Sequence, residues 1–282
     1  MPSSRDIKRR IKSVSSTQQN TQAMKLVSSA KLRRTRASFQ AASPYCSRLT
    51  EALCRLAPSC KNHPWLAEQE GEGRVLYVAI GADRGLAGSF NACLHRFLAD
   101  LLSAEQRDYD LLAAGTRLVD FCRRRGYNLT GTLDGVGDNP DFQSGLELAQ
   151  RLTSSFDKGE YAAIYLVHAA FHNSLAPQAV RRRLLPLELP ELPEKEESDF
   201  IIEPSREELL SALLPLYANT TVYTALVETK AAEHGARMAA MSAATDNARE
   251  MISELTLSLN RARQAAITTE ISEIAGGAAA LH

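Results

Sequence analysis

The sequence has few of the residues that build disulfide-linked or metal-held folds. Its 282 residues include 5 cysteines, 1 tryptophan and 15 glycines. The cysteines are odd in number, and their spacings match none of the zinc, haem or thioredoxin-like patterns, which favours a reducing compartment. With 44% hydrophobic residues, the chain can bury a sizeable core without disulfides or metal.

Long hydrophobic runs are also missing. The N-terminus has no apolar signal-peptide region, and we expect no stretch of the roughly 18 apolar residues that a membrane span needs. An Arg-rich, acid-poor start is also found in transit peptides, but specific motifs begin within it at Asp6. The sequence therefore predicts an ordinary soluble protein.

No arrangement of residues predicts a catalytic centre. The six histidines are scattered, and none lies in a nucleophile elbow or at a metal-ligand spacing. His168 and His172 are four residues apart, but they lie in or after a predicted strand rather than on one helix face. We interpret the histidines as core or surface residues, and we predict no catalytic, cofactor-binding or metal-binding residues.

Charge is balanced overall but unevenly distributed. Basic and acidic residues number 33 each, so the formal net charge is zero. Residues 1–48 hold eleven basic residues and one acidic residue, a net charge of +10, whereas residues 188–208 hold nine acidic and two basic residues, a net charge of −7. Because a solvated face usually carries both signs, the basic segment predicts a partner: a nucleic acid, an anionic membrane surface or an acidic protein.

Long helical patterns occupy both ends of the chain. Residues 4–57 contain no glycine, and their apolar residues recur at steps of three and four, which predicts an amphipathic helix. From Ser205 a second such pattern runs towards the C-terminus, with a break or kink expected at Pro215; roughly sixty residues of helix span about 90 Å. Two such helices can share their apolar faces only by pairing antiparallel, so we predict a coiled coil.

The middle of the chain alternates between strand and helix patterns. The apolar, β-rich runs are 74–82, 109–115 and 161–170. The helical patterns are 89–104, 116–125 and 141–156. This alternation predicts a parallel sheet covered on both faces. The predicted fold class is therefore α/β plus coiled coil: an inserted Rossmann-like domain (73–190) between an N-terminal coiled-coil helix (1–57) and a C-terminal one (205–282).

A glycine-rich loop, "GADRGLAGSF" (81–90), follows the first predicted strand and enters a helix. Gly85 and Gly88 could cradle an anion at the start of that helix. The spacing is neither that of a dinucleotide fingerprint nor that of a P-loop, and a strand-to-helix turn needs flexible glycines in any case. We therefore favour a structural turn.

Three segments carry a resemblance to a known family. They are "IKRRIKSVSSTQQNTQAMKLVSSAKLRR" (7–34), "DRGLAGSFN" (83–91), and "ARMAAMSAATDNARE" with "NRARQAAITTEISEIAGGAAAL" (236–281). Together they resemble the gamma subunit of F-type ATP synthases, over essentially the whole chain and in the same order of helix, α/β insert and helix.

The resemblance implies a central rotor shaft in a proton-translocating ATP synthase, coupling c-ring rotation to ATP synthesis or hydrolysis at the alpha and beta subunits. The chain would be a non-catalytic subunit without a cofactor. Its implied partners are the alpha and beta subunits around the coiled coil, and epsilon and the c-ring at the α/β domain and lower coil. The C-terminal run of small, weakly charged residues suits a helix end that rotates inside the ring of alpha and beta subunits, because a fixed ion pair there would hold the shaft at one rotational position.

The resemblance also implies roles for single residues. Met24 matches the neck methionine that faces an acidic loop of beta, and Lys25 would add attraction to that loop. Arg263 and Gln264 would form the catch against beta, and Glu203 matches an acidic position near the foot. The residues tied to coupling in the family are Arg237, Gln264, Thr268 and Glu270.

The compartment and two other functions remain to be considered. The cysteine-bearing regulatory insert of the chloroplast form is absent, so we expect a bacterial protein, peripheral to the inner membrane on its cytoplasmic side. One alternative is a coiled-coil protein that binds nucleic acid or a membrane surface, which rests on the basic helix alone. The other is a nucleotide-binding α/β enzyme, which rests on the loop at 81–90.

Overall fold

The computed structural model describes residues 4–59, 63–66, 73–133, 137, 139–171, 177–188 and 202–279. The chain forms two compact units: residues 1–27 with 238–282, and residues 28–237. Residues 189–201, most of the acidic segment at 188–208, lie outside the described residues, as do His172 and the last three residues. The units divide the chain inside both long helices, and the predicted domain boundaries stay predictions.

Two long helices begin and end the described chain. Helix α1 covers Ser4–Leu56 with 53 residues, and α5 covers Arg206–Ala279 with 74 residues. Of the break or kink predicted at Pro215, the break is wrong, because α5 continues through this residue, and the kink stays a prediction. A proline removes one backbone hydrogen bond of a helix. The buried side chains of Leu214 and Ala218, on either side of it, keep this part of α5 packed in the core.

Within residues 28–237, five strands form one sheet in the order β3-β2-β1-β4-β5. The strands are β1 (Val75–Ile80), β2 (Tyr109–Ala114), β3 (Leu129–Leu133), β4 (Ala163–Ala170) and β5 (Gln178–Leu185). Strands β1 to β4 are parallel, as predicted, whereas β5 pairs antiparallel with β4. The predicted fold class is confirmed, and the sheet is mixed rather than wholly parallel.

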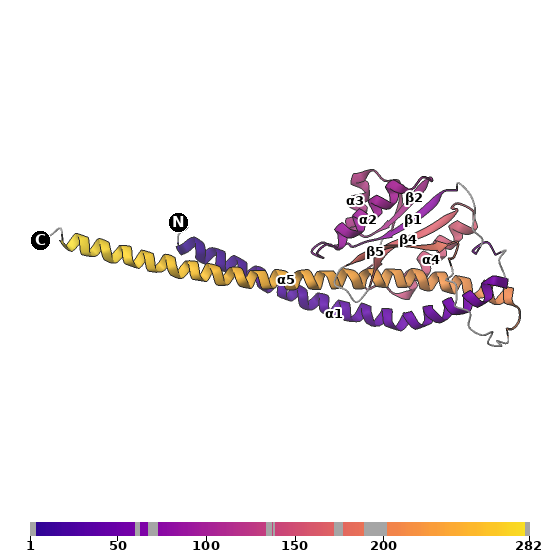
Figure 1. Ribbon diagram of the computed structural model, residues 1–282, viewed down its shortest axis with the longest axis horizontal. Helices are drawn as coiled ribbons and strands as arrows, with labels where there is room; N and C mark the ends of the chain where they lie inside the picture. The colour runs from indigo at the N-terminus through magenta and orange to yellow at the C-terminus, as the bar shows by residue number, and fades with distance from the viewer. Residues whose placement is uncertain are drawn as a thin grey trace. The chain divides into compact units, whose positions relative to one another are not determined.

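Three shorter helices connect the strands, close to their predicted ranges. They are α2 (Phe90–Ala104), α3 (Thr116–Arg125) and α4 (Phe142–Asp157). Figure 1 shows α2 and α3 on one side of the sheet and α4 on the other. Asp141 caps α4, its side chain accepting a hydrogen bond of 2.9 Å from the Ser144 amide.

Alternate side chains of the sheet enter two separate cores. Val75, Tyr77 and Ala79 of β1 join the core beneath α2 and α3. Leu76, Val78 and Ile80 of β1 join a core with α4 and with the facing parts of α1 and α5. The long helices contribute Leu49, Leu53, Leu56, Leu210, Leu214, Ala218, Val222, Ala225 and Leu226 to this second core. One face of the sheet is therefore packed directly on the paired long helices.

The stretch Arg206–Ser272 of α5 is long and apolar enough to cross a membrane by length and composition alone. The expectation that no such stretch exists is therefore wrong. Its most apolar window is 56% buried inside the protein. A helix that packs on a sheet carries an apolar face for the core, and this face accounts for the composition.

Candidate functional site

In the unit of residues 1–27 and 238–282, the two long helices are joined by polar side chains. Thr245 Oγ1 lies 2.8 Å from Thr21 Oγ1, and Lys25 Nζ donates to Ser242 Oγ at 3.0 Å. The residue number rises along α1 as it falls along α5, so the helices are antiparallel here, as predicted. Thr21 and Lys25 belong to the polar stretch "STQQNTQAMK" (16–25) of α1, so this stretch is partly hydrogen-bonded to α5.

Beside these contacts, α1 presents an apolar surface to solvent. Met24 is 44% exposed, and the next apolar residues, Leu26 and Val27, are 62% and 55% exposed. Large exposed apolar side chains that adjoin one another are typical of a contact surface. The ammonium of Lys25 is already bound to Ser242, so any attraction to an acidic partner uses its remaining N–H groups.

The predicted catch lies on the exposed C-terminal part of α5. Arg263, Gln264, Thr268 and Glu270 are all exposed. Thr268 Oγ1 donates to the Gln264 carbonyl at 3.0 Å, a bond within the helix. In the part of the chain that the structure describes, no ion pair engages Arg263 or Glu270. Their charged groups are free to meet another chain.

Arg237 faces inward, in the unit of residues 28–237. Its side chain is 13% exposed, and Nη2 donates to Glu233 Oε1 at 2.6 Å. Nε and Nη2 each lie 3.4 Å from the carbonyl oxygen of Gly85, in the predicted loop at 81–90. Lys230 Nζ lies 3.1 Å from Glu233 Oε2 and 3.6 Å from Asp83 Oδ2. The structure therefore joins α5 to the loop through charged groups.

Sequence reasoning missed Lys230 and Glu233. Their spacing offered a signal, since positions 230, 233 and 237 are three and four residues apart and so lie on one helix face. What the spacing does not give is their burial. Both residues are 1% exposed.

The loop itself is a turn between β1 and α2. Leu86 has a φ of +60° and Gly88 a φ of +57°. Asp83 Oδ1 accepts a hydrogen bond of 3.1 Å from the Thr116 amide at the start of α3. The carboxylate of Asp83 is thus part of the loop, and its negative charge would repel a bound anion. This favours a structural turn over an anion cradle.

Glu203 is exposed and comes three residues before α5 begins. Ser205, two residues later, accepts a hydrogen bond of 3.2 Å from the Glu208 amide and so caps the helix. In the described part of the unit of residues 28–237, no hydrogen bond or ion pair joins Glu203 to Arg237. The predicted residues are divided between the two units: Glu203 and Arg237 belong to residues 28–237, and the others, Met24, Lys25, Arg263, Gln264, Thr268 and Glu270, belong to residues 1–27 and 238–282.

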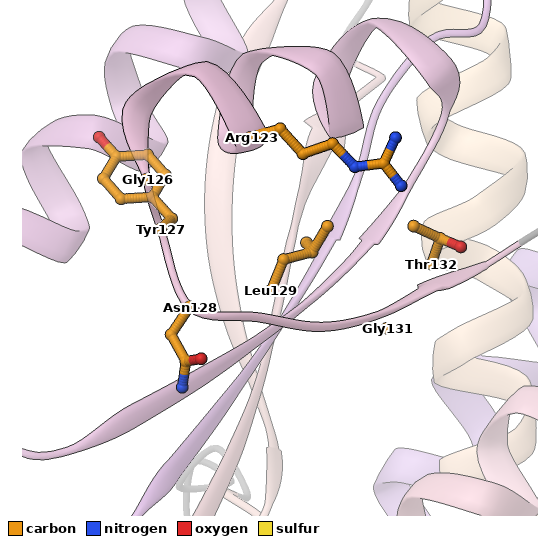
Figure 2. Close-up of a pocket in the computed structure, with 7 residues that line it drawn as sticks. All are labelled: Arg123, Gly126, Tyr127, Asn128, Leu129, Gly131 and Thr132. Atoms are coloured by element: carbon orange, nitrogen blue, oxygen red, sulfur yellow. The ribbon is translucent and has the colours of Figure 1, made fainter.

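An open groove of about 670 Å³ lies between the C-terminal end of α3 and the edge strand β3 (Figure 2). Its lining residues are Arg123, Gly126, Tyr127, Asn128, Leu129, Gly131 and Thr132. None of the predicted functional residues is among them. Across the described residues, no group of three or more His, Cys, Asp or Glu side chains could hold a metal ion.

Comparison with known proteins gives matches along the whole chain. Residues 3–281 match the family described as ATP synthase. The ATP synthase gamma chain of Desulforamulus reducens is 47% identical over 288 residues, covering 100% of both chains. That of Desulfitobacterium hafniense is 45% identical over 284 residues, again covering 100% of both.

Solved structures show the same fold at lower identity. A chain of the Euglena gracilis mitochondrial ATP synthase, in a structure of OSCP, F1 and the c-ring, has a TM-score of 0.68 and 17% identity, covering 99% of this chain and 94% of that one. A chain of the Tetrahymena thermophila central stalk and c-ring has a TM-score of 0.60 and 22% identity, covering 79% of this chain and 98% of that one.

Proposed function

This chain belongs to the ATP synthase gamma chain family, and from this premise we propose that it is the central rotor shaft of a proton-translocating F-type ATP synthase. It couples rotation of a c-ring to ATP synthesis or hydrolysis on other subunits, and it is itself a non-catalytic subunit. The observation that carries the proposal is the 47% identity to a gamma chain over the full length of both proteins. The long helices, paired antiparallel, suit a shaft.

Its partners are the alpha and beta subunits around the coiled coil, and epsilon and the c-ring at the α/β domain and lower coil. The structural neighbours come from assemblies described as F1 with a c-ring and as a central stalk with a c-ring, which supports these partners. The exposed basic residues of α1 then serve acidic protein surfaces rather than nucleic acid. No cofactor is assigned to the chain.

We assign the predicted residues to separate steps of torque transfer. Met24, with Lys25 beside it, meets an acidic loop of beta at the neck, which its exposure supports. Arg263 and Gln264 form the catch against beta. Thr268 and Glu270, on the same exposed part of α5, take part in coupling, as does Arg237 from within the fold.

Glu203 serves the foot of the shaft, in keeping with its exposure just before α5. The gamma chain belongs to a membrane-associated complex. We place this one at a bacterial inner membrane, on the cytoplasmic side, as a peripheral component that is held there by its partners.

Purification through a tag on this chain tests the proposal. Detergent-solubilised membranes should yield the chain together with alpha, beta, epsilon and c subunits, and this complex should hydrolyse ATP. The isolated chain should not hydrolyse ATP. Recovery of the chain alone, or bound to duplex DNA with a steep dependence on salt, would favour the nucleic-acid alternative instead.

A further inference from the structure

Four charged side chains gather where α5 passes the loop at 83–88. Lys230 and Arg237 supply two positive charges, and Glu233 and Asp83 supply two negative charges, so the group is balanced. Lys230 and Glu233 are both 1% exposed. Taking a charge out of water is costly, and a buried charge therefore needs its partners.

Glu233 is the centre of this group. Its Oε2 lies 3.1 Å from Lys230 Nζ, and its Oε1 accepts from Arg237 Nη2 at 2.6 Å. One carboxylate thus fixes two cations that lie on opposite sides of it along α5. Among the described residues, Glu233 makes no hydrogen bond or ion pair with the loop, so any effect it has there passes through Lys230 and Arg237.

Both cations reach the loop. Arg237 donates to the Gly85 carbonyl through two nitrogens at 3.4 Å, and Lys230 lies 3.6 Å from Oδ2 of the half-exposed Asp83. The other oxygen of Asp83 accepts from the Thr116 amide. The loop is therefore attached to α5 at two residues and to the start of α3 at one.

The backbone of the loop needs such support. Leu86 adopts a left-handed conformation with a φ of +60°, and its side chain is 63% exposed. A non-glycine residue in this region is strained, and it keeps its conformation only where the surroundings impose it. Leu86 itself contributes little burial, so its conformation is imposed by its neighbours: the attachments at Asp83 and Gly85, and the buried Ala87, which shares a core cluster with Ala232 and Ala236 of α5.

We propose that Lys230 and Glu233 are positioning residues that fix the loop at 83–88 to α5, so that the loop turns with the shaft as one body. Arg237 then acts in coupling through its inward attachment to Gly85, and not by direct contact with a partner's carboxylate. The attachment rests on the geometry alone. Its importance for coupling rests on the proposed rotor function.

Hydrogen exchange in the assembled complex tests the attachment. Glu233→Gln keeps the shape of the side chain and removes its charge. Lys230→Met removes the ammonium group that pairs with Glu233 and Asp83. In both variants, two amides that donate to the loop, Phe90 to the Ala87 carbonyl and Thr116 to Asp83, should exchange at least tenfold faster. Leu214→Ala is the matched control, because it weakens the core of the same unit on α5 without touching the loop. Its Phe90 and Thr116 amides should exchange as in the wild type.

Two results would overturn the attachment: unchanged loop exchange in both charge variants, or an equal rise in the Leu214→Ala complex. Proton pumping per ATP hydrolysed, measured in vesicles, tests the link to coupling. The ratio should fall several-fold in both charge variants and stay normal in the control. Raised loop exchange with a normal ratio would overturn the role in coupling and leave the attachment standing. If the wild-type complex pumped no protons, the rotor function itself would fail, whatever the loop does.

Discussion

At the scale of single residues, the most informative side chains are the polar ones that α5 buries. Glu228, Lys230, Glu233 and His234 are all at most 7% exposed, although a long helix could have turned them to solvent. Each is paired, as burial of polar groups requires. The middle of α5 is therefore held to its surroundings by specific partners as well as by apolar packing.

The pair of His168 and Glu228 gives a first prediction. His168 is fully buried, its Nε2 lies 2.9 Å from Glu228 Oε2, and its Nδ1 has no hydrogen-bond partner. Glu228→Leu should destabilise the chain by about 1–3 kcal/mol, because it leaves both ring nitrogens unsatisfied. Urea denaturation of the purified chain measures this. Adding His168→Leu to Glu228→Leu should recover most of the lost free energy of unfolding. A double variant that is less stable than Glu228→Leu would contradict the role given to the unsatisfied ring nitrogens.

Glu105 gives a prediction about pH. Hydrogen bonds from Arg107, together with one from the Tyr77 hydroxyl, lower the pKa of Glu105 from 4.5 to about 2. A carboxyl whose pKa is lowered by folding stabilises the protein above its unfolded pKa, and this contribution is lost as the pH falls from 4.5 through 2. The Glu105→Gln variant should therefore have a lower melting temperature than the wild type at pH 7. This difference in melting temperature should shrink as the pH falls. A difference that is equal at pH 7 and pH 3 would contradict the lowered pKa of Glu105.

The candidate functional residues were predictable from sequence only in part. The motifs around Met24, Arg237 and Arg263 identify these positions through a family resemblance, and their helical setting follows from periodicity. The partners Lys230 and Glu233 could not be predicted. Their role depends on a loop that is distant in the sequence and adjacent only after the sheet has packed on α5.

At the scale of elements, the contact between α4 and α5 depends on a glycine. A Cβ placed on Gly145 would lie 2.9 Å from Tyr223 Cβ and 3.0 Å from Tyr223 Cα. Gly235, inside α5, is also buried, but a Cβ there would have room, with Leu32 Cδ1 nearest at 3.9 Å, an ordinary van der Waals contact. The first glycine permits a close approach of two helices, and the second is not required by packing.

These two glycines give opposite predictions for the same substitution. Gly145→Ala should destabilise the chain by about 1–3 kcal/mol, because overpacking outweighs the gain in helix propensity. Gly235→Ala should stabilise it by up to about 1 kcal/mol, since only the propensity changes. Thermal unfolding of both variants checks the pair. If Gly145→Ala were the more stable variant, the close packing of α4 on α5 would be wrong.

Local pattern identified most elements, and the exceptions have physical reasons. Strand β3, "LTGTL", is polar and lies at the sheet edge, so it lacks the apolar run by which β1, β2 and β4 were recognised. Strand β5 contains Arg181, Arg182 and Arg183 and lies at the other edge. An edge strand is formed through its neighbour rather than by its own burial, and composition alone does not reveal it.

At the scale of the whole molecule, we expect assembly and torque transfer to depend on different contacts. Assembly should rest on many distributed contacts along both helices, whereas the proposed catch should rest on a few directional bonds. Arginine can make two parallel bonds to a carboxylate, so a reversed charge at the catch removes them and adds repulsion. The C-terminal residues 276–282 are mostly Ala and Gly, so we expect them to contribute shape rather than specific bonds.

Charge reversal at the catch therefore has a specific expected result. Arg263→Glu should lower ATP synthesis in membrane vesicles at least tenfold while the complex still assembles. Arg261→Glu, an equally exposed reversal two residues away on another side of α5, is the matched control and should have a much smaller effect. Deletion of residues 276–282 should also lower ATP synthesis less than Arg263→Glu does. Loss of synthesis in the fully assembled deletion complex, with normal synthesis for Arg263→Glu, would contradict the division between catch and tip.

The central claim is that this chain turns inside its complex, and rotation is its most direct test. The alpha and beta ring would be fixed to a surface, and a bead would be attached to a cysteine introduced at the exposed Glu203. On addition of ATP, the account predicts steady rotation of the bead in one direction, and no rotation once a cross-link ties α5 to a beta subunit. A complex that hydrolyses ATP at its full rate while an unlinked bead on this chain stays still would contradict the account.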